Sequence, residues 1–268
     1  MDIAAIDRSA TRDDGFLRAA APISKLVALA LVLAAVLTSF NVLVLLGVFV
    51  GLVAMGLAGR LPMRLALTLA AYPALFAAVF AVASAPDPMT AAVIIMKAVC
   101  AALAAVTVVL STPYPYIFAP IQRIVPGIVG DALLMTYRAT FLLLGKFGSL
   151  LRAVRLRAGA RGHAPVRTLR LSASAMGGLL LYSVDLAQRD YDVMRLRGYE
   201  GRLRTSPRRS RDRKADVLVI VAAVLALATA VLWRLGAETL NPYSWLVPIP
   251  AVMALAAVAV SRPRKDPA

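Results

Sequence analysis

The sequence has almost none of the side chains that usually build metal sites and disulfides. Among its 268 residues there is one cysteine, Cys100, and one histidine, His163. A single cysteine excludes an intrachain disulfide, and neither residue has a second of its kind with which to form a multi-ligand metal site. Cys100 lies inside an apolar run, where a small buried hydrophobic side chain is its ordinary role. We therefore expect this chain to hold no metal ion of its own.

Charged residues are also scarce, at 16% of the chain, whereas about a quarter of an average soluble domain is charged. Hydrophobic residues make up 60%, and they are concentrated in long runs. A run of about 18 apolar residues or more can cross a bilayer as a helix. The sequence therefore predicts an all-α fold, a polytopic membrane helix bundle. Four acidic residues precede the first apolar run, so a cleavable signal peptide is not expected.

Six apolar stretches, separated by polar or turn-forming residues, are expected to be transmembrane helices. They cover residues 23–38, 42–57, 65–84, 90–110, 216–235 and 244–260. Together with the segments around them, they predict five parts of the chain. These are a polar N-terminal segment at 1–22, helices one to four within 23–111, a long basic segment at 112–215, helices five and six within 216–261, and a tail at 262–268.

The basic residues alternate between successive connections. The N-terminal segment, the connector at 59–64, the long basic segment and the tail carry several each. Two of the other three connections carry none, and the connection after the fifth helix carries only Arg234. Because Lys and Arg favour the cytoplasmic side of a membrane, both termini and the long basic segment are predicted to be cytoplasmic. Lys97 is the one charge well inside a span, and we expect it to extend to the interface or to contact another subunit.

The long basic segment at 112–215 holds 19 of the 30 Lys and Arg residues and 6 of the 14 acids. Its apolar residues recur at three- and four-residue steps, which predicts two amphipathic helices. A more continuously apolar piece precedes each helix, at 132–144 and 171–181, and we expect these pieces to lie against the membrane or pack into the bundle without crossing it. The periodic positions are Phe147, Leu150, Leu151, Val154 and Ala158 in the first helix, and Leu179, Tyr182, Leu186 and Val193 in the second. Asp185, Asp190 and Asp192 are expected to pair with Arg189 and Arg195 within the second helix.

Both amphipathic helices end in an arginine followed by a glycine. The pairs are Arg161 with Gly162 and Arg197 with Gly198. Glycine after a helix lets the chain turn through a left-handed conformation, and the helix dipole favours a cation on the last turn. An arginine in that place can make a forked hydrogen-bonded contact with a carboxylate. The two helix ends are therefore expected either to dock a protein or to face anionic lipid headgroups.

At these residues the sequence resembles the transmembrane T component of energy-coupling factor (ECF) transporters, and within it the cobalt-type CbiQ family. That family has two Ala-Arg-Gly motifs at the ends of two cytoplasmic coupling helices. The matching residues are Ala160, Arg161 and Gly162 in the first motif, and Leu196, Arg197 and Gly198 in the second, where leucine replaces alanine. Further similarities are Pro22 and Lys25 before the first helix, and Tyr199, Glu200 and Gly201 after the second motif.

The resemblance implies a non-catalytic coupling subunit of an ATP-driven importer for cobalt ions in the bacterial cytoplasmic membrane. Residues 112–215 are then a coupling domain, in which Arg161 and Arg197 dock onto two ATP-binding cassette ATPase subunits. Gly162 and Gly198 let the chain turn away from that contact. ATP and Mg²⁺ are bound by the ATPases, and this chain is expected to bind no cofactor. A separate membrane S component holds the substrate, and lipids surround the bundle.

Alternatives remain open at this stage. The chain could be a T subunit for another metal or a vitamin, because the substrate is recognised by a different chain. A self-contained secondary transporter or membrane enzyme requires ionisable residues along a path through the spans, and there are few beyond Lys97 and Arg138. No P-loop motif and no nucleophile–base pair is present, so we assign no catalytic residue. A nucleic-acid interface is not expected, because membrane topology already explains the basic charge.

Overall fold

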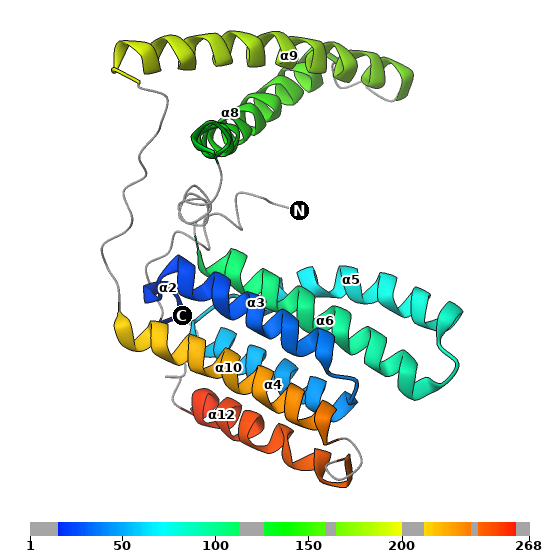
Figure 1. Cartoon of the computed structure of the whole chain (residues 1–268). Coiled ribbons are helices and arrows are strands. Elements are labelled where there is room, and N and C mark those ends of the chain that lie inside the picture. Colours follow the sequence, from blue (N-terminus) through cyan, green and yellow to red (C-terminus); the bar gives the residue numbers. More distant parts are fainter. Residues whose placement is uncertain (1–15, 113–125, 159–164, 200–211, 237–240, 261–268) are drawn as a thin grey trace. The chain divides into compact units, whose positions relative to one another are not determined.

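The computed structural model of the chain describes residues 16–112, 126–158, 165–199, 212–236 and 241–260. All regular elements within these residues are helices, which confirms the predicted all-α fold (Figure 1). The chain divides into two compact units, which are described separately below. Unit 1 comprises residues 1–117 and 208–268, and unit 2 comprises residues 118–207.

Unit 1 contains the strongly apolar helices. Along the described chain they are α2 (Phe16–Ala19), α3 (Pro22–Thr38), α4 (Val42–Ala58), α5 (Met63–Ser84), α6 (Pro88–Ser111), α10 (Arg213–Leu235), the short 3-10 helix η1 (Asn241–Leu246) and α12 (Pro248–Val260). Figure 1 shows them as a bundle of helices lying side by side. Within it α3 packs against α10 and α6, α4 packs against α6 and α12, and α5 packs mainly against α6.

All six predicted apolar stretches are helical. Four of them are long and apolar enough to cross a membrane, namely α5, α6, α10 and the pair formed by η1 and α12. The other two, α3 and α4, have 17 residues each, at the short end of the roughly 17–25 residues that spanning helices use. Among the described residues, one further helix of sufficient length and apolarity lies in unit 2, at Gly127–Val154. The chain is a multi-pass membrane protein.

Local signals in the sequence set the beginnings of these helices. Asn41 precedes α4, and its side-chain oxygen accepts a hydrogen bond from the backbone N–H of Leu43 at 2.9 Å. Asp212 caps α10 in the same way, accepting from the N–H of Lys214 at 3.1 Å. Such caps satisfy N–H groups that have no partner within the helix. Pro22 begins α3, at a position where a helix leaves the N–H unpaired in any case.

Two cations reach the carboxyl end of α3. The ammonium of Lys97, on α6, donates a hydrogen bond to the carbonyl of Leu37 at 3.0 Å and lies 3.7 Å from the centre of the Phe40 ring. The guanidinium of Arg234, on α10, donates to the carbonyl of Thr38 at 3.2 Å. The last carbonyls of a helix lack partners within it and favour positive charge. Lys97 therefore extends to the end of a neighbouring helix, where it satisfies one of these carbonyls.

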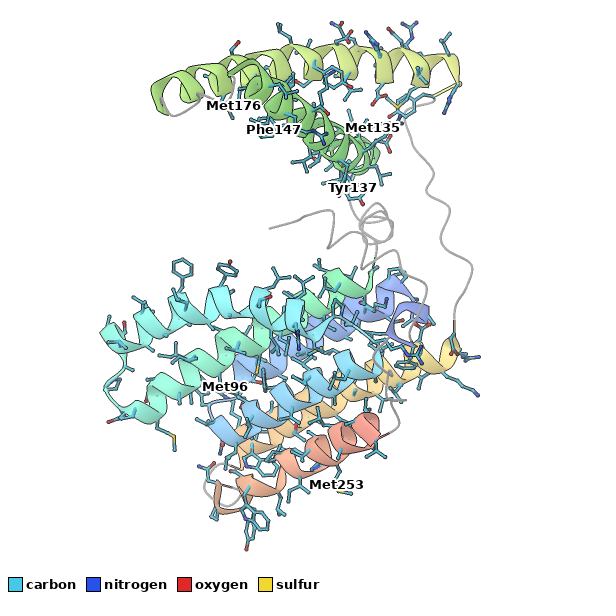
Figure 2. The ribbon with its side chains drawn as sticks, turned by 180° about the vertical axis from the view of Figure 1, so that it is seen from behind. Met96, Met135, Tyr137, Phe147, Met176 and Met253 are labelled. Atoms are coloured by element: carbon cyan, nitrogen blue, oxygen red, sulfur yellow. The ribbon has the colours of Figure 1, made fainter. Side chains whose placement is uncertain are left out.

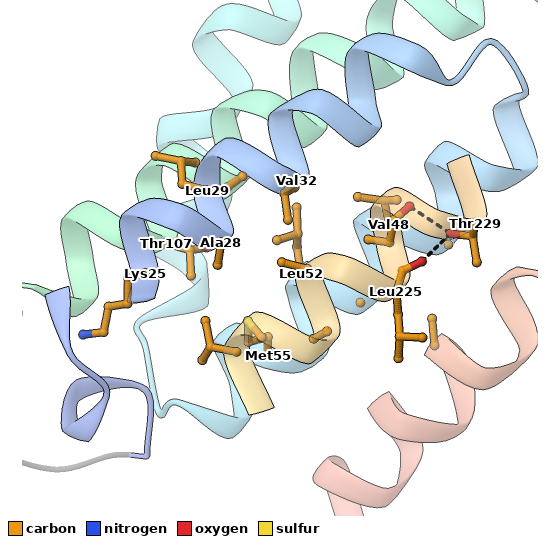
Figure 3. A pocket seen from close by; sticks show the side chains of 18 of the residues that line it. Lys25, Ala28, Leu29, Val32, Val48, Leu52, Met55, Thr107, Leu225 and Thr229 are labelled. Carbon is orange, nitrogen blue, oxygen red and sulfur yellow. Dashed lines mark hydrogen bonds between the residues drawn. The ribbon is translucent and has the colours of Figure 1, made fainter. Parts of the chain in front are cut away.

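A largely apolar cavity of about 240 Å³ lies among α3, α4, α6, α10 and α12 (Figure 3). Two of its hydroxyl side chains are already used within their own helices. Thr107 donates to the carbonyl of Leu103 at 2.7 Å, and Thr229 donates to the carbonyl of Leu225 at 3.0 Å. Among the described residues that line it, Lys25 alone is charged. The cavity therefore offers mainly hydrocarbon surface, which suits apolar groups better than a hydrated ion.

Two glycines of α4 allow a matched test of this cavity. A Cβ atom at Gly51 would meet no atom within 4 Å, whereas one at Gly47 would lie 3.1 Å from Cγ1 of Val247. Alanine stabilises a helix interior by about 0.5–1 kcal/mol relative to glycine. We expect Gly51→Ala to raise the thermal unfolding temperature in detergent by a few degrees, and Gly47→Ala to leave it unchanged or lower it. Equal shifts for the two variants would contradict the cavity described here.

Unit 2 consists of two long helices, α8 (Gly127–Ala158) and α9 (Pro165–Leu196). Arg138 of α8 forms an ion pair with Asp190 of α9 at 3.8 Å. Farther along, the ammonium of Lys146 lies 4.9 Å from the centre of the Tyr182 ring. Later positions of α8 thus meet earlier positions of α9, so the two helices run antiparallel. Figure 2 shows their side chains and labels Met135, Tyr137 and Phe147 of α8 and Met176 of α9.

Two predictions about unit 2 are corrected by the structure. The apolar pieces at 132–144 and 171–181 are not separate helices, because each continues without interruption into the amphipathic stretch after it. No proline lies between piece and stretch, so nothing ends the helix there. In addition, Asp190 does not pair within its own helix, since it lies on the face of α9 that meets Arg138. The expected pair of Asp185 with Arg189 is present, at 2.8 Å.

Most of the predicted apolar positions face inward. On α9, Leu179, Tyr182 and Leu186 are half-buried, whereas Val193 is 44% exposed and does not continue that face. On α8, the predicted apolar positions Phe147, Leu150, Leu151 and Val154 are also half-buried. The side chain of Ala158 lies outside the described residues.

Candidate docking site

The carboxyl end of α9 is a tight helix-terminating turn. Gly198 has a φ of +76°, in the left-handed region that glycine adopts without strain. Its N–H donates to the carbonyl of Arg195 at 3.1 Å, and the N–H of Tyr199 donates to the carbonyl of Met194 at 3.1 Å. These two bonds form a Schellman motif, which satisfies carbonyls that the end of the helix leaves unpaired. The role that the sequence predicts for Gly198 in turning the chain is therefore matched by its geometry.

Arg197 is carried on this turn, one residue after the last residue of α9. Its backbone N–H donates to the carbonyls of Val193 and Met194, both at 3.1 Å, so its backbone is held by the helix. Its side chain is exposed. Within the described part of the chain, the guanidinium has no ion pair. Arg197 therefore presents a full complement of N–H donors to solvent at a fixed point, as docking to a carboxylate requires.

Leu196 precedes Arg197 and is 88% exposed. It occupies the place where the CbiQ-type motif has alanine, and it adds a large apolar surface next to the guanidinium. Arginine is among the residues enriched at the centres of protein interfaces, and Leu196 adds exposed apolar surface to the residue before it.

The turn after Arg197 is attached to α8 by a side chain. The hydroxyl of Tyr199 donates a hydrogen bond to Oδ2 of Asp131 at 2.5 Å. Asp131 lies near the beginning of α8 and is only 5% exposed. The hydrogen bond to Asp131 raises the pKa of the Tyr199 phenol above its ordinary value. The sequence offered no signal for this contact, because 68 positions separate the two residues.

The other charged residues around the tip of α9 are of both signs. Arg195 is exposed and lies 6.0 Å from the centre of the Tyr191 ring, a cation–π contact that leaves its charge available. Asp190 is engaged by Arg138, and Asp192 is exposed. The positive charge at the tip therefore comes from Arg195 and Arg197.

The first predicted motif, at Ala160, Arg161 and Gly162, lies outside the described residues. The description of α8 ends at Ala158 and that of α9 begins at Pro165. The assignment of Arg161 as the first docking residue stays a prediction.

In unit 1, buried polar contacts fix the two points at which the chain leaves the bundle. Lys25 of α3 is 3% exposed, and its ammonium donates to the carbonyl of Ser111 and to Oγ1 of Thr112, both at 3.0 Å. α6 ends at these residues, so Lys25 connects the start of α3 to the point where the chain leaves α6. Asp216 of α10, 4% exposed, accepts a hydrogen bond from the backbone N–H of Ala21 at 2.6 Å. The returning chain is therefore tied to the same place.

Comparison with known proteins identifies the family. The sequence model of the family described as CbiQ, cobalt transport protein, matches residues 15–207. The chain belongs to the CbiQ family. This is the family of ECF transporter T components, as the two arginine–glycine motifs indicated. The match includes both motifs and the whole of unit 2, and no curated protein matches the chain.

Membership of the CbiQ family makes the chain a component of a cobalt transporter. Cobalt is then cargo of the transporter, and its ligands need not be in this subunit. Within the described residues, no group of three or more His, Cys, Asp or Glu side chains could hold a metal ion. What the described residues do present is a pair of long helices with an arginine at the tip.

Proposed function

We propose that this chain is the coupling subunit of an ECF-type importer for cobalt ions. It holds two cytoplasmic ATP-binding cassette ATPases through Arg161 and Arg197, and passes their ATP-driven movement to a membrane S component that carries the substrate. ATP and Mg²⁺ are bound by the ATPases. The chain lies in the bacterial cytoplasmic membrane, with both termini and unit 2 on the cytoplasmic side.

The observation that carries the proposal is the tip of α9. Arg197 is exposed, has no ion pair within the described residues, and is fixed by a Schellman turn at the end of a 32-residue helix. Contact with anionic lipid headgroups requires only an exposed cation, and an arginine on a flexible segment can make it. A fixed arginine, beside an 88% exposed leucine, supports docking to a protein surface with a carboxylate at a defined place.

The membrane bundle supports a coupling role more than a transport path of its own. The cavity among its helices is lined mainly by apolar side chains, and its threonines donate to their own helices. Lys97, the charged residue within α6, is engaged at the end of α3. A path for a hydrated metal ion needs ionisable or oxygen-bearing side chains directed into it. This supports the view that the substrate is carried by another chain, whose identity decides between cobalt and a different metal or vitamin.

Purification of the chain from its own membranes in mild detergent tests the proposal. We expect two ATPase chains and a small membrane protein to be recovered with it, and cobalt uptake by cells to depend on all of them. The isolated chain should not hydrolyse ATP. Recovery of the chain alone, with cobalt uptake intact when the ATPase genes are deleted, would show that the coupling role is wrong.

A further inference from the structure

We propose that the Tyr199–Asp131 hydrogen bond is a strut that fixes the direction of Arg197, making Tyr199 and Asp131 positioning residues for ATPase docking. This inference rests on the proposed function, and it assigns to the docking site two residues that lie outside the arginine–glycine motif.

The first step concerns the order in which the backbone is held. Before Arg197, the chain is fixed by the last hydrogen bonds of α9. After it, Gly198 turns the chain through a positive φ, and only two positions beyond Arg197 the hydroxyl of Tyr199 reaches Oδ2 of Asp131 at 2.5 Å. Arg197 therefore lies between two attachments, one on α9 and one on α8. Without the second attachment, the end of a helix frays easily.

The second step concerns the strength of the attachment. Asp131 is 5% exposed, so water does not readily replace Tyr199 as a hydrogen-bond donor. A hydrogen bond to a buried carboxylate is stronger than one between neutral groups, so the hydroxyl of Tyr199 holds the turn after α9 firmly to α8.

The third step concerns what the attachment does for binding. Immobilising a long side chain and its backbone at an interface opposes association, unless the free protein already holds them in place. Because the hydrogen bond between Tyr199 and Asp131 already holds the backbone at Arg197, less conformational freedom is lost when Arg197 docks. Loss of this hydrogen bond should therefore weaken the docking of one ATPase while leaving the guanidinium itself present, an effect that is smaller than that of removing Arg197.

The test uses Tyr199→Phe in the full chain, which removes only the hydroxyl. In nanodiscs, we expect the affinity for the co-purified ATPase pair to fall by about 3- to 10-fold. Asp131→Ala should give a similar loss, whereas Asp131→Asn, which keeps an acceptor oxygen, should restore most of the binding. Tyr191→Phe is the matched control, since Tyr191 is an exposed tyrosine of α9, and the affinity of this variant should be unchanged.

A mutant cycle separates a positioning role from a general structural one. If Tyr199 acts through Arg197, Tyr199→Phe should cause no further loss in an Arg197→Ala background, but its full loss in an Arg161→Ala background. Equal additional losses in both backgrounds would overturn the strut. If Arg197→Ala itself leaves ATPase binding unchanged, the proposed docking function fails, and the strut fails with it.

A spin label at position 197 tests the strut without any partner. The lone cysteine, Cys100, is fully buried, so an Arg197→Cys variant of the full chain can be labelled selectively. We expect the label to become more mobile when Tyr199→Phe is added and to be unaffected by Tyr191→Phe. Unchanged mobility with Tyr199→Phe would show that the hydrogen bond does not hold the tip, even if Arg197 does dock the ATPase.

Discussion

Reversing the charge of both proposed docking arginines, with Arg161→Glu and Arg197→Glu together, is expected to release the two ATPases from the membrane subunit. Truncating one partner of a desolvated, hydrogen-bonded charge pair loses about 2–5 kcal/mol of binding, and reversal adds repulsion. The affinity should therefore fall by more than about 100-fold. The measurement is the amount of ATPase that co-purifies with the full chain, followed by titration of the ATPase pair onto nanodiscs.

The control for charge reversal keeps the same change in net charge. Arg152 and Arg189 are exposed arginines of α8 and α9, and Arg152→Glu with Arg189→Glu also lowers the net charge of the same unit by four, through the loss of two positive charges and the gain of two negative ones. That variant should keep its ATPases, apart from an effect that disappears when salt is raised. Equal release by both double variants would mean that unspecific attraction to a basic surface holds the ATPases. The single variants show whether the two tips contribute alike.

The sequence was sufficient for the fold because the signals that produce it are local. Apolar runs, the caps at Asn41 and Asp212, and the prolines and glycines between the runs determine each helix from its own residues. It was also sufficient for the tip of α9, since the turn at Gly198 depends on one residue type at one position. The lengths of α8 and α9 were underestimated, because a change from apolar to amphipathic pattern does not end a helix unless a breaker accompanies it.

Contacts between distant parts of the chain were beyond sequence reasoning. The pattern identified Lys25 only as a residue that the family shares, whereas the structure shows its ammonium at the end of α6, 86 positions away. Asp190 and Asp131 are similar cases, since Asp190 pairs with the opposite helix of unit 2 and Asp131 with the turn that follows α9. Helical periodicity indicates which face of a helix is apolar, but not which residue of another helix will lie opposite a given carboxylate. For that reason the residues proposed to position Arg197 came from the structure.

Lys25 is expected to determine how firmly the departing chain is joined to the bundle. The end of α6 lies within reach of Lys25. The ammonium donates to the carbonyl of Ser111 and to the hydroxyl of Thr112, and all three residues are buried. If the chain couples ATPases to transport as proposed, their movement reaches the bundle through this junction and through the one at Asp216. A loose junction would then let the ATPases turn over without moving the bundle.

Replacing Lys25 with methionine keeps the length of the side chain and removes its charge and donors. Leaving a buried carbonyl or hydroxyl without its hydrogen-bond donor typically destabilises by about 1–3 kcal/mol, which corresponds to roughly 2–12 °C in unfolding temperature for a chain of this size. We expect Lys25→Met to show that shift in detergent, and to reduce cobalt uptake more than ATP hydrolysis by the assembled complex. Lys214 is an exposed lysine in the first turn of α10, and Lys214→Met should change neither the unfolding temperature nor the balance between uptake and hydrolysis. An unfolding temperature equal to that of the unmodified protein would show that the Lys25 contacts do not hold the end of α6. A parallel loss of cobalt uptake and ATP hydrolysis would show that the substitution impairs assembly of the complex and not the transmission of movement within it.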